Sequence, residues 1–139
     1  MIDFTVIYPA VNHDNPGNDP YIAKVSKQRT FIRQVAGGRS DKGTCDHLFA
    51  GMNAGSMQEF PWFLQAQARS MSVGDVVALY KSDDRIVGKW FICDSCGWLE
   101  VNATQAQSWL DFDRKYGCCS FELNQWKKSM NLVDENASF

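Results

Sequence analysis

The chain has 139 residues and a formal net charge of −2, and 45% of its residues are hydrophobic and 13% aromatic. This length suits a single compact domain, residues 1–139, whose core needs no disulfides, and the hydrophobic content excludes an intrinsically disordered chain. No apolar run approaches the roughly 20 residues of a membrane span, and the N-terminus lacks a signal peptide, so we expect a cytoplasmic protein without membrane contact.

The first predicted strand covers residues 3–8, which are rich in β-branched and aromatic side chains. Residues 12–20 then form a dense cluster of Asn, Asp, Gly and Pro, which predicts an exposed loop. Long loops carry function more often than the elements they connect. His13 and Asp14 in this loop are therefore candidate functional side chains.

The next strand signals lie at residues 21–25 and 30–35, which form two strands or one bent strand. Because successive side chains of a strand point to opposite faces, residues 30–35 divide into two sets. Phe31, Arg33 and Val35 share one face, and Thr30, Ile32 and Gln34 share the other. Both faces are mixed in polarity, so we expect neither of them to be dry.

Basic residues gather in and around these strands. Between residues 24 and 42, six basic side chains stand against a single acidic one, although the whole chain is acidic. Such a segment is either a patch for nucleic acid or for an acidic protein surface, or a solvated strand face with its loops. Tryptophan and arginine are the residue types that anchor interfaces. The candidate binding residues are Lys24, Lys27, Arg29, Arg33, Arg39, His13, Asp14, Trp62 and Trp98.

Two helices are expected in the middle of the chain. Residues 45–52 predict a short helix with Thr44 placed to cap it. Residues 56–70 predict a longer helix with Pro61 in its first turn, where the missing amide hydrogen costs nothing. Trp62 on this helix is either exposed or covers an edge of the sheet.

Residues 74–93 predict a β-hairpin. Gly74-Asp75 is typical of a tight turn, residues 76–80 are apolar, residues 81–85 break the run with charge, and residues 86–93 return. Both arms are apolar at nearly every position, which indicates burial on both faces. We therefore predict an α+β fold, in which an antiparallel sheet with this hairpin at its centre packs against two or three helices.

The C-terminal part predicts two more helices. Thr104 and Gln107 have capping-box spacing, and the helix they open is expected to end at Gly117. Residues 124–128 indicate one further short helix. Residues 131–139 are polar and acidic, and we expect them to be frayed.

Residues 93–97 read Cys-Asp-Ser-Cys-Gly, the pattern of a zinc knuckle with Cys93 and Cys96 as ligands. The chain has five cysteines, and an odd number fits reduced thiols better than a disulfide framework. The alternatives to zinc are cysteines buried in the core or turns and a thioredoxin-like redox pair, which would require a helix after the motif. The other two zinc ligands would come from Cys45 with His47 or from Cys118 with Cys119.

A cysteine enzyme is a third possibility, with Cys45, His47 or His13 as its reactive groups. In a helix, Cys45 and His47 point in different directions and do not form a nucleophile–base pair unaided. These side chains would have to converge on a pocket.

The run Ser-Met-Ser-Val-Gly-Asp-Val-Val at residues 70–77 and the run Trp-Phe-Ile-Cys-Asp-Ser at residues 90–95 carry a family resemblance. Over residues 69–100 the chain resembles the YodL-like group of small bacterial, plasmid and phage-borne domains. That group commonly has an aromatic residue at the position of Cys96, which implies a packing role there. The resemblance brings no assigned chemistry, and it implies an accessory protein of a mobile element.

We therefore expect a non-enzymatic binding module of a phage, plasmid or other mobile element. Its partner would be a protein or nucleic acid with an acidic surface, and no cofactor is expected. The alternatives are a small zinc-stabilised domain using Cys93 and Cys96 and, third, a Cys/His enzyme.

Overall fold

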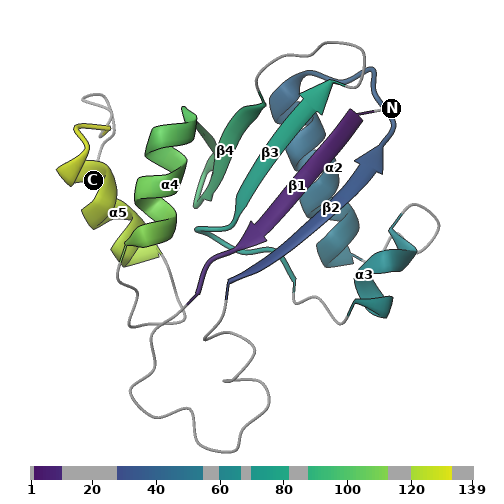
Figure 1. Ribbon diagram of the computed structural model, residues 1–139, viewed down its shortest axis with the longest axis horizontal. Coiled ribbons are helices and arrows are strands. Elements are labelled where there is room, and N and C mark those ends of the chain that lie inside the picture. The colour runs from purple at the N-terminus through teal and green to yellow at the C-terminus, as the bar shows by residue number, and fades with distance from the viewer. Residues whose placement is uncertain are drawn as a thin grey trace, which may run out of the picture.

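A five-stranded antiparallel sheet with helices on both faces forms the centre of the molecule (Figure 1). The computed structural model describes residues 2–10, 28–54, 60–66, 70–81, 88–112 and 120–132. The elements in chain order are β1 (Ile2–Tyr8), β2 (Arg29–Val35), α2 (Asp41–Ala54), α3 (Pro61–Gln65), β3 (Val76–Lys81), β4 (Lys89–Asp94), β5 (Gly97–Val101), α4 (Ala103–Asp111) and α5 (Ser120–Ser129). The strands lie in the order β2-β1-β3-β4-β5, which makes β2 and β5 the edges and confirms the α+β prediction.

The predicted hairpin supplies the middle of this sheet. β3 and β4 pair antiparallel, with Val76 opposite Ile92. Gly74 has a φ of +97°, and the carboxylate of Asp75 accepts a hydrogen bond of 2.8 Å from the amide of Ser72. The turn therefore forms by the predicted chemistry, because glycine tolerates positive φ and aspartate bonds its own backbone. The side chains of β3 from Val76 to Leu79 are buried on both faces, as expected.

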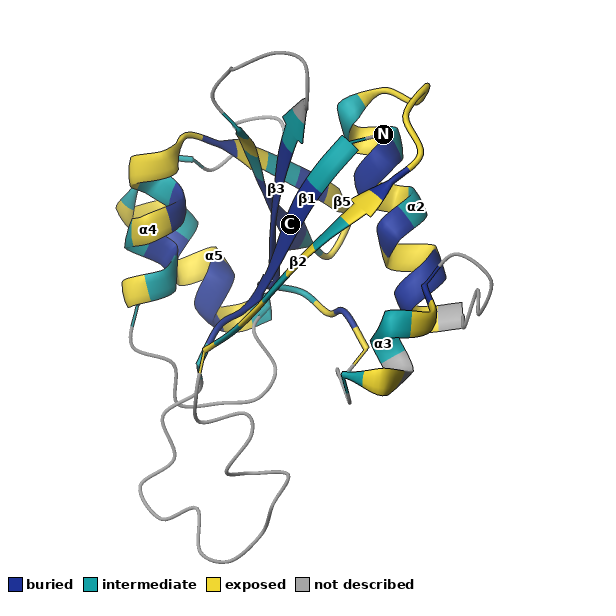
Figure 2. Cartoon of the chain, turned by 45° about the vertical axis from the view of Figure 1, so that its right-hand side comes forward, coloured by how far each residue is buried: buried dark blue, intermediate teal, exposed yellow. Residues whose placement is uncertain are grey.

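The buried side chains divide into two clusters, one on each face of the sheet. Figure 2 shows α2 and α3 on one side of the strands and α4 and α5 on the other. On the α2 side, Cys45, Leu48 and Met52 of the helix recur at helical spacing and pack against the strands. On the other side, Trp109 of α4 and Trp126 of α5 fill the core, with ring centroids 5.6 Å apart.

α2 begins earlier than predicted. The hydroxyl of Ser40 accepts a hydrogen bond of 3.0 Å from the amide of Gly43, so Ser40 caps the helix. Thr44 is fully buried inside the first turns, where its hydroxyl donates to the carbonyl of Ser40 at 3.0 Å. The prediction of Thr44 as the cap is therefore wrong.

The cap of α4 also differs from the prediction. Asn102 is the N-cap, with its side chain accepting from the amide of Gln105 at 2.7 Å and the side chain of Gln105 accepting from the amide of Asn102 at 2.9 Å. The predicted pair of Thr104 and Gln107 is wrong, since Gln107 donates instead to Asp111 at 2.9 Å. The pair Asn102 and Gln105 has the same spacing as the pair Thr104 and Gln107, and the pair that directly follows β5 caps the helix.

The predicted helix at 56–70 contains α3, and Pro61 is its first residue as expected. Residues 55–59 and 67–69, which would complete that helix, lie outside the described residues. No helix in the described part of the chain is long and apolar enough to cross a lipid bilayer.

α5 begins at Ser120, before the predicted start at residue 124. α4 ends at Asp111, and its C-cap Phe112 has an extended backbone, so the predicted end of this helix at Gly117 is wrong. The predicted loop at 12–20 and the predicted strand at 21–25 lie outside the described residues, as do residues 133–139 of the C-terminal segment that is predicted to be frayed.

Candidate functional site

β2 is an edge strand of the described sheet and pairs there with β1 alone, from Ile2 opposite Val35 to Tyr8 opposite Arg29. Its side chains alternate as predicted. Phe31 packs against the core on the α2 side, where Val35 is buried, while Ile32 lies on the opposite face. The strand thus has one face packed against the α2 layer, an opposite face and an outer edge.

α3 brings an aromatic side chain against the first of these faces. The ring of Trp62 lies 5.6 Å from that of Phe31 and 6.3 Å from that of Phe4, measured between centroids. The guanidinium carbon of Arg33 lies 5.0 Å from the centroid of Trp62, within the range of a cation–π interaction. Trp62 therefore covers this face of β1 and β2 and lies in contact with a cation.

Arg29, at the start of β2, contacts the same group of aromatic side chains and the residue that follows α3. Its guanidinium carbon lies 5.0 Å from the centroid of Phe31, and its Nη2 donates to the carbonyl of Ala66 at 2.9 Å. The side chain thereby joins β2 to the residue that follows α3. We call the surface made by Arg29, Phe31, Arg33 and Trp62 the arginine edge.

The indole nitrogen of Trp62 is buried and has no hydrogen-bond partner among the described residues. Buried polar groups are nearly always paired, so an unpaired one in a native fold needs an explanation, such as a functional role. Packing between Phe4 and Phe31 holds the ring in this position nonetheless.

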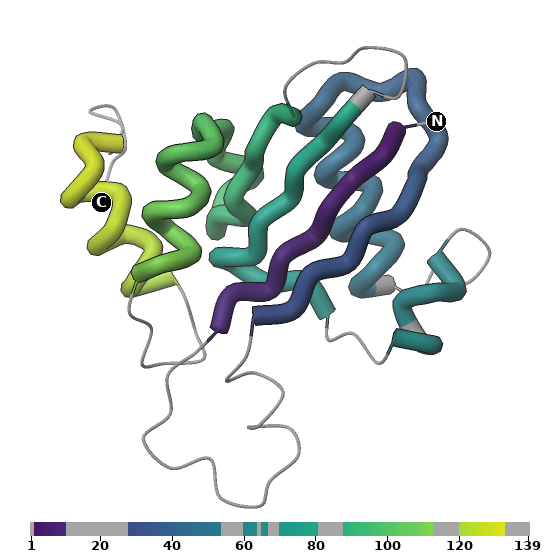
Figure 3. Tube along the Cα trace, in the orientation of Figure 1, coloured from purple at the N-terminus to yellow at the C-terminus, as the bar shows by residue number. Residues whose placement is uncertain are grey.

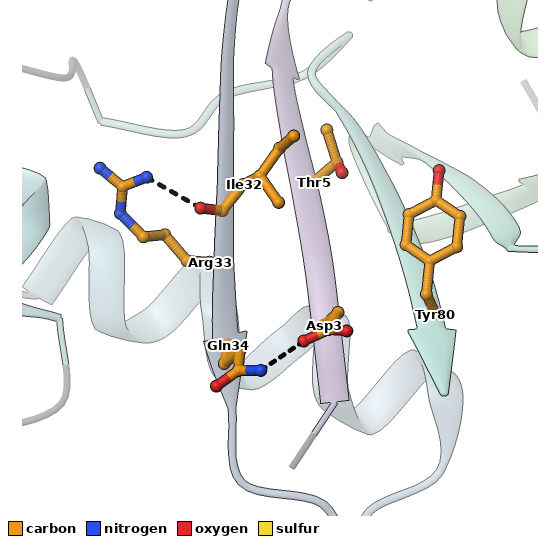
Figure 4. Close-up of a pocket in the computed structure, with 6 residues that line it drawn as sticks. All are labelled: Asp3, Thr5, Ile32, Arg33, Gln34 and Tyr80. Atoms are coloured by element: carbon orange, nitrogen blue, oxygen red, sulfur yellow. Dashed lines mark hydrogen bonds between the residues drawn. The ribbon is translucent and has the colours of Figure 1, made fainter. Parts of the chain in front are cut away.

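The opposite face of β2 and β1 is open. In Figure 3, no helix of the described chain passes in front of these two strands. A shallow hollow of about 510 Å³ lies there and is lined by Asp3, Thr5, Ile32, Arg33, Gln34 and Tyr80 (Figure 4). Ile32 is 67% exposed, and the amide nitrogen of the Gln34 side chain donates to the Asp3 carboxylate at 2.7 Å. This hollow combines an exposed apolar side chain with a polar rim.

Tyr80 forms the far wall of the hollow, and a glycine fixes its position. A Cβ atom at Gly88 would lie 2.8 and 2.9 Å from Cδ1 and Cζ of the Tyr80 ring. Only glycine allows the ring to lie so close to the neighbouring backbone, an aromatic-on-glycine arrangement known from designed sheets.

Of the predicted binding residues, the structure brings together Arg29, Arg33 and Trp62. Arg39 is exposed in the segment before α2, where its Nη1 donates to the carbonyl of Ala36 at 3.1 Å. Lys24, Lys27, His13 and Asp14 lie outside the described residues.

Trp98 does not join this surface. It lies on β5, the opposite edge of the sheet, and is only 8% exposed. Its indole nitrogen donates to the Asp46 carboxylate of α2 at 3.0 Å, which satisfies the one polar atom of the side chain. The structure therefore gives Trp98 a role in attaching α2 to the sheet.

Cys93 and Cys96 flank a tight turn between β4 and β5 and face different surroundings. Cys93 is 4% exposed in the core on the α2 side, whereas Cys96 is exposed at the turn. Burial, with the carboxylates of Asp75 and Asp94 nearby, raises the pKa of Cys93 to about 12. Among the described residues, no group of three or more His, Cys, Asp or Glu side chains is placed to hold a metal ion, and Cys118 and Cys119 lie outside those residues.

The predicted enzyme residues Cys45 and His47 also lie in surroundings that do not suit catalysis. Cys45 is fully buried, and burial, with Asp46 and Asp41 adding to it, raises the pKa of its thiol to about 12. His47 packs against Phe60, with ring centroids 5.6 Å apart. A nucleophilic cysteine needs a lowered pKa and access to substrate, and Cys45 has neither.

Apart from Arg33, the residues that line the open hollow were not among the predicted site residues. Their signal was nevertheless present in the sequence, because Ile32 stands between Thr30 and Gln34 on a strand face that has no other apolar residue. An apolar side chain isolated in this way on a polar strand face is a candidate for exposure.

The chain matches no family model, no curated protein and no solved structure.

Proposed function

We propose that the protein is a non-enzymatic binding module that takes an acidic segment of a partner protein at the arginine edge. The observation that carries the proposal is the state of Arg33. Its guanidinium lies against the ring of Trp62, and among the described residues its only hydrogen bond is to the carbonyl of the neighbouring residue, Ile32, at 2.8 Å. No carboxylate among the described residues pairs with it, so its charge is available to a partner.

An arginine in this position is suited to carboxylate binding. Its planar fork matches the two oxygens of a carboxylate, and stacking on Trp62 restricts the side chain before the partner arrives. Arg29 adds a second positive charge along the same face of β2. The fork geometry of Arg33 and the added positive charge of Arg29 both favour an acidic ligand over a neutral one.

A protein partner is favoured over nucleic acid. Nucleic-acid affinity rests on many contacts between basic side chains and phosphates. The described part of the arginine edge offers the guanidinium groups of Arg29 and Arg33, whereas Arg39 lies in the segment before α2. Two such charges are few for a phosphate backbone. The resemblance to YodL-like domains, and with it the link to a mobile element, stays a prediction.

The proposal is tested with two labelled probes, a ten-residue polyglutamate peptide and a ten-nucleotide oligothymidine, by fluorescence anisotropy at low ionic strength. We expect the peptide to bind more tightly than the oligonucleotide and to dissociate as salt is added. Arg33→Gln should weaken peptide binding about tenfold, as the loss of one charge-assisted hydrogen bond implies.

The matched control is Lys128→Gln, which removes the same charge from an exposed position on α5, in the layer across the sheet. It should leave peptide binding unchanged, and both variants should keep the melting temperature of the parent protein. Tighter binding of the oligonucleotide, or equal peptide affinity of the Arg33→Gln variant and the parent, would contradict the proposal.

A further inference from the structure

We propose that β2 receives the acidic segment as an added strand, and that this segment is extended and carries carboxylates at alternate positions. This inference rests on the proposed function and specifies the form of the ligand. It follows from the backbone of β2, which the proposed function does not use.

The first step concerns the outer edge of β2. The carbonyl of Ile32 points away from β1, toward the guanidinium of Arg33 that donates to it (Figure 4). In an antiparallel pair, successive residues turn their backbone groups alternately toward and away from the neighbouring strand. The N–H and C=O groups of Thr30, Ile32 and Gln34 therefore point outward, and those of Phe31 and Arg33 point toward β1.

The second step concerns what occupies that edge. Arg33 donates to the Ile32 carbonyl from the side at which an added strand would place an amide. Its side chain thus fills the position of one backbone donor while no partner is bound. When an added strand supplies its own amide, the guanidinium is released toward a carboxylate of the same strand.

The third step concerns side-chain alternation. A strand added to β2 would lie about 4.8 Å away and point successive side chains to the two faces of the sheet. One set would face the arginine edge, where Arg29 and Arg33 favour carboxylates. The other set would lie beside Ile32 at the open hollow, where an apolar side chain can cover the 67% of Ile32 that is exposed. The matching ligand alternates acidic with apolar, β-branched residues.

A second copy of the chain fits this edge less well. If β2 paired with β2 of another molecule, Arg29 and Arg33 of both copies would lie close together along the interface between the two strands. Like charges on neighbouring strands destabilise the pairing, whereas an acidic strand relieves the charge. Charge complementarity therefore selects a partner of the opposite sign.

The test compares two seven-residue peptides of identical composition, acetyl-EVEVEVE-amide and acetyl-EEEEVVV-amide. We expect the alternating peptide to bind at least about tenfold more tightly, because only its sequence places every carboxylate on the face of Arg29 and Arg33 when its backbone pairs with β2. Hydrogen exchange followed by NMR on the parent protein should show slower exchange of the Thr30, Ile32 and Gln34 amides when the alternating peptide is bound. This readout requires no variant.

Ile32→Pro removes one outward N–H, a change tolerated at strand edges because no bond to β1 is lost. It should abolish the preference for the alternating peptide, while Ile32→Ala, which keeps the N–H, should preserve it. If both peptides bind equally and Arg33→Gln weakens both, strand addition is wrong and the proposed function stands. Failure of both peptides to bind at 1 mM overturns both proposals. A dimer of the free protein that Ile32→Pro dissociates would assign the edge to a second copy and overturn this inference.

Discussion

Replacing Gly51 of α2 with alanine tests how the helix layer beside the candidate site is packed. A Cβ atom at this position would overlap Cε2 and Cδ2 of Phe60 and lie 3.1 Å from Cζ, whereas unstrained carbon atoms approach to about 3.5–4.0 Å. Phe60 is itself only 2% exposed, so its ring has little room to retreat. The overlap should cost ~1–3 kcal/mol, which outweighs or cancels the ~1 kcal/mol by which alanine exceeds glycine in a helix.

We therefore expect Gly51→Ala to lower the free energy of unfolding by up to about 2 kcal/mol and the melting temperature by up to roughly 10 °C. Urea unfolding followed by far-UV circular dichroism measures the change. In a Phe60→Leu background, where the ring is absent, the penalty should shrink or reverse, which a double-mutant cycle detects. A stabilising Gly51→Ala substitution, or the same penalty in both backgrounds, would refute the packing argument.

Two further substitutions and one pH dependence test other features of the structure. Gly88→Ala should displace the ring of Tyr80 and lower stability by about 1 kcal/mol in urea unfolding, since the ring lies on this glycine. Burial raises the pKa of Cys45 and of Cys93 from the ordinary 9.0 to about 12. Because the thiols of the unfolded chain ionise first, the stability that these two groups contribute is full below pH 9 and falls between pH 9 and 12. Melting temperatures measured across that range test this prediction. Asn102→Ala should cost about 1 kcal/mol through loss of the α4 cap, measured in the same urea assay.

Each of these predictions has a matched control. Gly37→Ala should be nearly neutral, because its Cβ would lie at ordinary distances of 3.6 and 3.7 Å from the side chain of Ile2. A variant with both Cys45 and Cys93 replaced by alanine should show a shallower alkaline decline than the parent. Thr104→Ala should change stability by less than about 0.5 kcal/mol, since Thr104 is exposed and does not cap the helix. A loss at Thr104 equal to that at Asn102 would contradict the assigned cap.

The sheet was predictable because its signals are local. Residues 76–80 are apolar throughout, and a strand buried between two helix layers needs that composition. The helix starts were less predictable, since two side-chain pairs of equal spacing, at Asn102 and at Thr104, compete for the same end of α4. The choice depends on where β5 stops, at Val101, which is a property of strand pairing rather than of the helix sequence.

The candidate site was predictable in residue type but not in arrangement. Trp62 and Trp98 are equally plausible binding residues from the sequence, yet Trp62 packs from α3 against β1 and β2 while Trp98 is buried on β5. For Trp98, the register of the strands decides this outcome. Trp98 pairs with Cys93, whose side chain points into the α2 layer, and a slip of one residue at the Ser95 turn would turn the indole to the other face. Successive side chains of a strand alternate between the two faces of the sheet, so the register decides which of them are buried. The positions of arginines and tryptophans in the sequence therefore cannot locate a surface until the turns that set the register are known.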